Sequence, residues 1–154
     1  MWATIFCIGP LATNGGRPAA VTEGLGERWE LEQIALRLWP SASTIQGMIT
    51  AMFDLVEKHQ VGPDQVKKLR ISMSQPAFDL HGGFARYKAK FDALLSTHYA
   101  AAVILHDREL SLAQFERARY DDPKLRRFAA EQVEVKPDPG LTGVQALVEA
   151  ETVD

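Results

Sequence analysis

An amphipathic stretch between residues 43 and 59 is the feature that most constrains the fold of this chain. Its apolar residues recur at i, i+3, i+4, i+7, i+8 and i+11, the spacing of one helix face: Ile45, Met48, Ile49, Met52, Phe53 and Val56. We therefore predict a helix from about Ser43 to His59, capped by the hydroxyl of Ser43 or Thr44. With 154 residues, the chain is long enough to bury one core against this face.

Three other stretches alternate between apolar and polar residues, as half-buried strands do. They are "VKKLRISMS" (66–74), "VEVKP" (133–137) and "VQALVEAETV" (144–153). In the first, one face carries Leu69, Ile71 and Met73, and the other carries Lys68, Arg70 and Ser72. We predict a strand for each stretch, with the basic side chains of the first strand in solvent.

Periodicity and capping signals predict three more helices. One runs over about 91–106. A short one begins at Ser111, where Gln114 three residues later completes a capping box. The last begins at Asp122, with Pro123 in its first turn, where the missing N–H of proline costs nothing.

Glycines and prolines mark the segments between these elements. Residues 75–90 are predicted as a loop, residues 29–36 as a candidate strand, and residues 1–20 as an irregular N-terminal arm. The helices and strands segregate without a regular βαβ repeat, so we predict an α+β fold over residues 21–154. It would hold a small, mainly antiparallel sheet and about four helices.

The charge balance argues against one broad class of function. The formal net charge is −3, whereas nucleic-acid binding needs a basic surface, so no nucleic-acid partner is expected. The apolar opening Met1–Ala12 is too short to span a bilayer and lacks the basic start of a signal peptide. The single Cys7 excludes an intramolecular disulfide, which fits a reducing compartment. We expect a cytoplasmic protein with no membrane partner.

Most motifs that carry chemistry are absent from the sequence. Gly15-Gly16 lacks the Lys-Ser/Thr of a phosphate-binding loop, and there is no Gly-x-Ser-x-Gly elbow. His98 and His106 lie eight residues apart, about 12 Å along a helix, which is too far for one metal ion without further ligands. Taken as residues alone, Tyr99 is a core aromatic with its hydroxyl at the edge, and His98 is a helix-surface residue.

Three stretches in order carry a resemblance to a known family. They are "GLGERWELEQIALRLWPSAS" (24–43), "STHYAAAVILHDRELSLAQF" (96–115) and "FERARYDDPKLRRFAAEQVEV" (115–135). Their order and separations resemble the lid domain of the MmgE/PrpD family. That family includes 2-methylcitrate dehydratase, cis-aconitate decarboxylase and iminodisuccinate epimerase. The resemblance runs from about residue 20 to the end of the sequence.

The resemblance implies a fold and a chemistry. Members of the family combine a large helical domain with a smaller α+β lid domain, and the active site lies between the two. They act on small di- and tricarboxylates by proton abstraction next to a carboxyl group, without a metal or an organic cofactor. The chain would therefore be a lid-type domain or subunit of a lyase or isomerase, in a homo- or hetero-oligomer. A separate helical-domain partner chain would supply the family's catalytic aspartate and histidine.

The turn before the first helix is similar to the family's Lys-x-Tyr/Phe-Pro passage. The lysine falls on Arg37 and the aromatic residue on Trp39. Arginine stays protonated and grips carboxylates in a fork, so the resemblance implies that Arg37 clamps a substrate carboxylate. Trp39, Ser41 and Ser43 complete the expected substrate-binding set. A histidine that the decarboxylases carry five residues after the lysine is replaced by Ala42.

The alanine-rich helix supplies the expected catalytic pair. Tyr99 matches the family's lid tyrosine, whose phenol could hydrogen-bond a carboxylate or relay a proton, and His98 is its neighbour. The family's glycine at the end of this helix is Arg108 here. We expect the Arg37 guanidinium and the Tyr99 phenol to point into one shared hollow.

Two other functions remain open at this stage. The chain could be a non-catalytic module that keeps the lid fold for dimerisation or for binding small acids. It could also act alone on an unrelated substrate, with His98 or Asp92 as a base near Tyr99.

Overall fold

The computed structural model describes residues 22–27, 29, 31, 34, 36–83 and 85–153. The chain divides into two compact units, Met1–Leu36 and Arg37–Asp154. In the first unit, residues 22–27 form a turn in which Gly24 and Gly26 adopt positive φ angles. The described residues between 29 and 36 include no strand. The predicted N-terminal arm, residues 1–20, lies outside the described residues.

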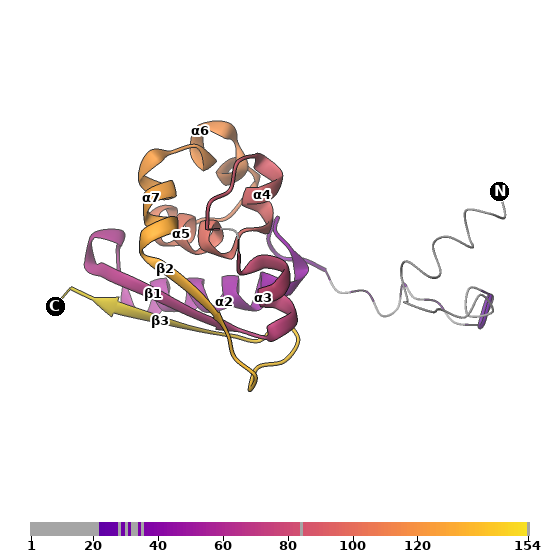
Figure 1. Ribbon diagram of the computed structural model, residues 1–154. Coiled ribbons are helices and arrows are strands. Elements are labelled where there is room, and N and C mark those ends of the chain that lie inside the picture. The colour runs from indigo at the N-terminus through magenta and orange to yellow at the C-terminus, as the bar shows by residue number, and fades with distance from the viewer. Residues whose placement is uncertain are drawn as a thin grey trace. The chain divides into compact units, whose positions relative to one another are not determined.

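A three-stranded mixed sheet lies in the second unit (Figure 1). Its strands are β1 (Val66–Met73), β2 (Val133–Pro137) and β3 (Ala146–Thr152), in the order β2-β1-β3. β1 pairs with β3 in an antiparallel ladder and with β2 in a shorter parallel one. The predicted α+β class with a small sheet, mostly antiparallel, is confirmed.

Helices and short 3-10 turns connect and cover these strands. In chain order they are η3 (Ser43–Ile45), α2 (Gln46–His59), η4 (Pro63–Gln65), α3 (Gln75–His81), α4 (Lys90–Leu95), α5 (Thr97–Asp107), η5 (Leu112–Phe115), α6 (Arg117–Tyr120) and α7 (Pro123–Glu131). Four helices among the described residues have seven residues or more: α2, α3, α5 and α7. None of the described helices is long and apolar enough to cross a membrane.

The core lies between the helices and one face of the sheet. The predicted inner face of β1 is fully buried, with Leu69, Ile71 and Met73 each at most 1% exposed. On the opposite face the side chains of Lys68 and Arg70 form ion pairs with carboxylates of the two neighbouring strands, at 2.6 and 2.5 Å. The predicted burial of Leu69, Ile71 and Met73 is therefore confirmed, whereas Ser72, predicted on the polar face, is only 2% exposed.

Two predictions for the segment after β1 are wrong. Residues 75–90 are not all loop, because α3 begins at Gln75 with a proline in its first turn, a position that proline tolerates. The helix predicted over 91–106 is interrupted at Ser96, whose extended backbone separates α4 from α5. The Ser96 hydroxyl accepts a hydrogen bond from the Tyr99 N–H at 3.0 Å and caps the new helix.

The capping predictions have mixed outcomes. The Ser111–Gln114 box and the Asp122 cap are confirmed by their hydrogen bonds. Neither Ser43 nor Thr44 caps the first helix: Ile45 is the N-cap of α2 and no side-chain bond is made there. Instead, the backbone that leads into this helix is held by a side chain from its first turn.

Candidate functional site

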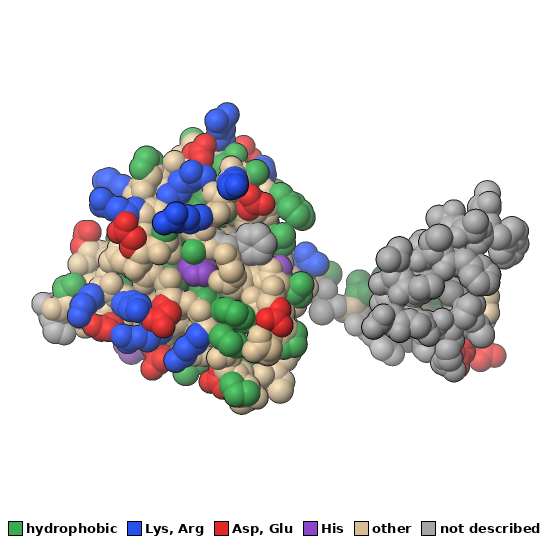
Figure 2. Space-filling view, viewed as in Figure 1, with side chains coloured by type: hydrophobic (Ala, Val, Ile, Leu, Met, Phe, Trp, Pro, Cys, Tyr) green, Lys and Arg blue, Asp and Glu red, His purple; other side chains and the backbone are tan. Residues whose placement is uncertain are grey.

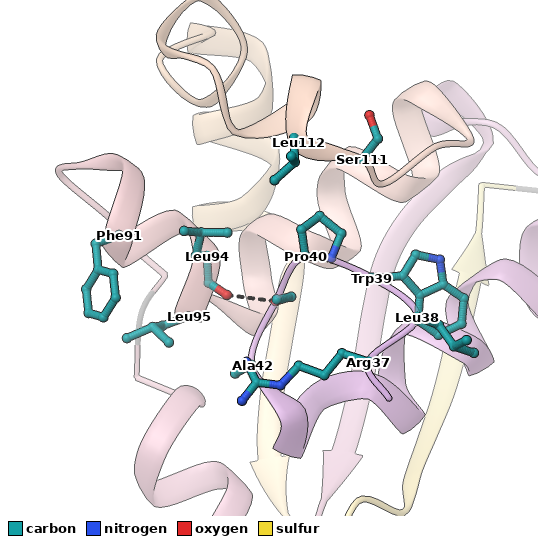
Figure 3. Close-up of a pocket in the computed structure, with 11 residues that line it drawn as sticks. Arg37, Leu38, Trp39, Pro40, Ala42, Phe91, Leu94, Leu95, Ser111 and Leu112 are labelled. Carbon is teal, nitrogen blue, oxygen red and sulfur yellow. Dashed lines mark hydrogen bonds between the residues drawn. The ribbon is translucent and has the colours of Figure 1, made fainter. Parts of the chain in front are cut away.

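A hollow of about 670 Å³ lies beside the turn that precedes η3. Its walls come from three parts of the chain that are distant in sequence (Figure 3). Residues 37–42 form the turn, α4 contributes Phe91, Leu94 and Leu95, and the start of η5 contributes Ser111 and Leu112. Four of the predicted site residues fall in or next to this turn.

The Gln46 side chain holds the turn in place. Its Oε1 accepts hydrogen bonds from the N–H groups of Leu38 and Trp39 at 3.2 and 3.3 Å. Its Nε2 donates to the Trp39 carbonyl at 3.1 Å and lies 3.5 and 3.4 Å from those of Ser41 and Ala42. One amide therefore satisfies several backbone groups that would otherwise lack partners. Sequence reasoning missed this residue, although Gln46 stands three residues after Ser43, the spacing of a capping box.

Two further contacts fix the walls of the hollow. The Trp39 ring stacks on Phe53 of α2, with ring centroids 5.5 Å apart and planes inclined by 21°. The hydroxyl of Ser41, a residue only 5% exposed, donates to the Leu94 carbonyl at 2.7 Å and ties the turn to α4. This bond is the dashed line in Figure 3. Ser43 begins η3, is exposed to solvent and does not line the hollow.

Among the described residues, Arg37 is the one charged residue that lines the hollow. Its side chain is exposed and, among the described residues, forms no ion pair or hydrogen bond. In Figure 3 it extends along the turn toward Ala42. An unpaired guanidinium at the edge of an apolar hollow can bind a carboxylate through two parallel hydrogen bonds.

Large exposed apolar side chains line the same hollow as this guanidinium. Leu38 is 77% exposed, Phe91 69% and Leu112 67%, and all three line the hollow. Exposed apolar side chains scattered singly are ordinary, but a contiguous group marks a surface on which another molecule or domain packs.

Tyr99 does not share this hollow, contrary to the expectation from the sequence. The residue is fully buried and is absent from the lining of the hollow beside Arg37. Its hydroxyl donates a hydrogen bond to the Gln114 carbonyl. Its ring packs edge-to-face on Tyr87 and Phe115, with centroids 4.9 and 5.6 Å away. Burial raises the pKa of Tyr99 well above its ordinary value, so the phenol stays neutral.

His98 is buried as well, so its placement on the helix surface is wrong. The residue is 6% exposed because every residue of α5 from Thr97 to Leu105 is buried. Burial lowers the pKa of His98 to about 4, and its Nδ1 has no hydrogen-bond partner in the described part of the chain. Burial also lowers the pKa of His81, a residue 7% exposed, although the Leu95 carbonyl opposes this effect. Both imidazoles are therefore neutral near pH 7.

Charged residues at the start of α4 and at the end of α5 have structural roles. The Asp107 carboxylate accepts two hydrogen bonds from the Arg119 guanidinium, one of them at 2.8 Å from Nε. The Asp92 carboxylate accepts hydrogen bonds from the N–H groups of Lys88 and Ala89, which precede α4, at 3.0 and 3.2 Å, and so helps to cap this helix. Arg108 ends α5 with a φ of 56°, the left-handed conformation that glycine adopts without strain.

No group of three or more His, Cys, Asp or Glu that could hold a metal ion occurs among the described residues.

Comparison with known protein families identifies most of this chain. Residues 39–151 match the MmgE/PrpD C-terminal domain. The match begins at Trp39, so it includes Ser41, Ser43, His98 and Tyr99, whereas Arg37 lies just before it. No curated protein matches the chain. Because the matched segment covers most of the 154 residues, the chain belongs to the MmgE/PrpD family, as its C-terminal domain.

Proposed function

We propose that this chain is the lid-type part of an MmgE/PrpD-like lyase or isomerase that acts on a small carboxylic acid. The reaction would be proton abstraction next to a carboxyl group, followed by elimination or reprotonation, with no cofactor. The observation that carries the proposal is the Arg37 guanidinium, which has no ion pair or hydrogen bond among the described residues and lies at the edge of a hollow next to the matched family domain.

The hollow suits one carboxylate better than a neutral ligand. Arg37 supplies a positive charge that persists at every physiological pH. The turn that carries it is held by Gln46 and by the Ser41–Leu94 hydrogen bond. A clamp on a held turn loses less conformational freedom on binding than one on a mobile loop. In this proposal Trp39 forms an apolar wall, and Ser41 and Ser43 orient the substrate near the turn.

A partner domain would complete the site. Leu38, Phe91 and Leu112 expose apolar surface along the hollow that Arg37 also lines, and a helical domain that packs there would bury it. Removing water from the hollow would also strengthen the attraction between Arg37 and a carboxylate, because the local dielectric constant falls. We propose that the partner carries the residues that move protons.

A catalytic role for Tyr99 and His98 requires a conformational change. The Tyr99 hydroxyl reaches a substrate only when its hydrogen bond to the Gln114 carbonyl breaks and η5 moves away. His98 would act as a base from its neutral form, which burial favours. Tyr99→Phe tests this step, because it removes the hydroxyl and keeps the ring packed.

Reconstitution tests the proposal as a whole. The chain and a helical-domain protein of the same family would be purified separately, mixed, and assayed on cis-aconitate and 2-methylcitrate. We expect no turnover from the chain alone and turnover from the mixture. Arg37→Ala should lower kcat/KM by about 100-fold, as the loss of a charge-assisted bidentate contact predicts. Lys58→Ala, which removes an exposed cation elsewhere, should leave the rate unchanged.

Two results would contradict this assignment. If Arg37→Ala is as active as Lys58→Ala in an active mixture, Arg37 does not bind the substrate. If Tyr99→Phe keeps full activity, the hydroxyl of Tyr99 has no part in catalysis.

The alternative function is a non-catalytic module that binds small acids or dimerises. Two observations favour it: Ala42 stands where the decarboxylases carry a histidine, and the Tyr99 phenol is buried and hydrogen-bonded. Thermal-shift measurements with a panel of di- and tricarboxylates distinguish a module that binds small acids from one that only dimerises. A ligand present at one hundred times its Kd stabilises a protein by about 2.7 kcal/mol. If none of the acids raises the melting temperature and the chain associates tightly with itself, the module has a structural role.

A further inference from the structure

A second hollow, of about 640 Å³, lies between the 85–88 segment, α6 and α7. Five of its lining residues are basic: Arg86, Lys88, Arg117, Arg126 and Arg127. Two are acidic, Asp121 and Glu131. The lining therefore carries an excess of three positive charges, whereas the whole chain has a net charge of −3. Figure 2 shows Lys and Arg side chains gathered over the part of the molecule that α6 and α7 form.

One of these cations is fixed by several contacts. The Arg126 guanidinium donates to the Tyr87 carbonyl at 2.8 Å and lies 5.2 Å from the centroid of the Tyr87 ring. It also pairs with Asp121 at 3.2 Å. The same carboxylate accepts from Arg117 at 3.2 Å, so Asp121 is shared between two arginines and neutralises only one of them. Arg126 is therefore held in position as part of the wall.

Three other cations of the hollow lack partners among the described residues. Arg86, Lys88 and Arg127 form no ion pair and no side-chain hydrogen bond within the described part of the chain. Like charges that converge on a concave surface repel one another, and such a surface concentrates the positive potential. A bound anion would relieve this repulsion and pair with several cations at once.

Tyr87 gives an independent observation at the same place. The residue lines the hollow and is only 3% exposed, and its hydroxyl has no geometric hydrogen-bond partner among the residues that the structure describes. Burial raises the pKa of Tyr87 to about 12, although the Arg126 guanidinium opposes this effect. The phenol is therefore a neutral donor at pH 7, and a buried donor without a partner in a basic wall is a feature that needs an acceptor.

We propose that this hollow is a binding site for a small polyanion that carries two or more phosphate or carboxylate groups. Arg86, Lys88 and Arg127 pair with the anionic groups, and Arg126 forms the fixed floor. The hollow shares no lining residue with the one beside Arg37. The site therefore does not depend on the function proposed above.

Calorimetric titration of the full chain at low ionic strength tests this site. Inorganic pyrophosphate and citrate are the two probes, because they separate phosphate from carboxylate chemistry. We expect at least one probe to bind with a Kd below about 1 mM. The double variant R86A/R127A should weaken that binding by about tenfold or more, since each lost charge-assisted bond contributes to affinity.

The matched control is the double variant K124A/K136A. It removes the same number of charges, and neither residue lines the hollow. We expect its Kd to lie within about twofold of that of the unmodified chain, because remote charges act only through the screened field. Circular dichroism establishes that each variant is folded. If the R86A/R127A variant is unfolded, the single variant K88A replaces it, with K136A as its control.

The outcomes are distinct. Binding of pyrophosphate alone identifies a phosphate site, and binding of citrate alone identifies a carboxylate site. The proposal is overturned if neither probe binds below about 1 mM. It is equally overturned if the control variant loses as much affinity as the site variant, because the attraction would then be due to net charge alone.

Discussion

The buried imidazole of His98 makes the stability of this domain depend on pH in a way that can be calculated. Its pKa is about 4 in the folded chain, against an ordinary value of 6.5. Above pH 6.5 both the folded and the unfolded chain carry a neutral His98, and this residue has no effect on the pH dependence. Between pH 6.5 and 4 the unfolded chain binds a proton that the folded chain does not. The free energy of unfolding therefore falls as the pH falls through this window, and the contribution is constant below it.

The magnitude follows from the difference in pKa. Each pKa unit corresponds to about 1.4 kcal/mol, so His98 lowers the free energy of unfolding by about 3 kcal/mol between pH 6.5 and 4. About 1 kcal/mol of this loss is reached by pH 5.5. Such a loss is a large part of the stability of a small domain, which is typically about 5–15 kcal/mol.

Urea denaturation at a series of pH values measures this effect. Other groups titrate in the same range, because the pKa values of the Asp122, Glu134 and Glu151 carboxyls are lowered and their stabilisation is lost in acid. The useful quantity is therefore the difference between the unmodified chain and His98→Gln at each pH. We expect the variant to lose about 3 kcal/mol less between pH 6.5 and 4. Parallel pH profiles, or an NMR titration that places the pKa of His98 near 6.5, would refute the reasoning.

Three substitutions test other parts of the fold by urea denaturation. Gln46→Ala removes the amide that holds the turn and should lower the free energy of unfolding by about 1–3 kcal/mol; no loss would mean that water replaces these bonds. Gly47→Ala places a Cβ 2.0 Å from the Val144 carbonyl oxygen. It should cost about 1–3 kcal/mol although alanine favours helices, and a more stable variant would contradict the close approach. Arg108→Gly should be more stable than Arg108→Ala by about 1 kcal/mol, because only alanine retains the cost of the left-handed φ; equal stabilities would contradict that conformation.

The periodic part of the fold was accessible from the sequence. The stripe that begins at Ile45 and the alternation from Val66 to Met73 arise because side chains repeat at fixed angles along a helix or a strand. When one side of such an element is buried, apolar residues recur in the sequence at the period of the helix or strand. The caps at Ser111 and Asp122 were accessible for a different reason, since a hydroxyl or carboxylate there bonds to backbone groups two or three residues away.

The same reasoning explains the failures around α5. A helix buried on every side has no polar face, so periodicity gives no sign of which residues are exposed. His98 was therefore assigned to the surface on its polarity alone. The break at Ser96 was hidden because the apolar spacing continues across it, while a serine hydroxyl starts a new helix.

The candidate site depends on contacts that local patterns do not contain. The turn with Arg37 and Trp39 was identified through a resemblance to a known family. The other walls of the hollow come from Phe91 and Leu112, which approach the turn only when α4 and η5 pack beside it. Such long-range proximity follows from the packing of the whole domain, and a single sequence does not specify it.

Because Arg37 and Tyr99 do not share a hollow, substitutions of Arg37 should affect substrate binding and not the chemical step. Under the proposed function, Arg37 holds a carboxylate that carries its charge both in the substrate and in the transition state. A contact that is equally strong in both states raises KM when it is lost and leaves kcat nearly unchanged. We therefore expect Arg37→Ala to act mainly on KM in the reconstituted mixture, and Arg37→Lys to restore part of the loss as a point charge. A fall in kcat at saturating substrate would show instead that the guanidinium bond strengthens during the reaction, and that the turn held by Gln46 takes part in the chemistry as well as in binding.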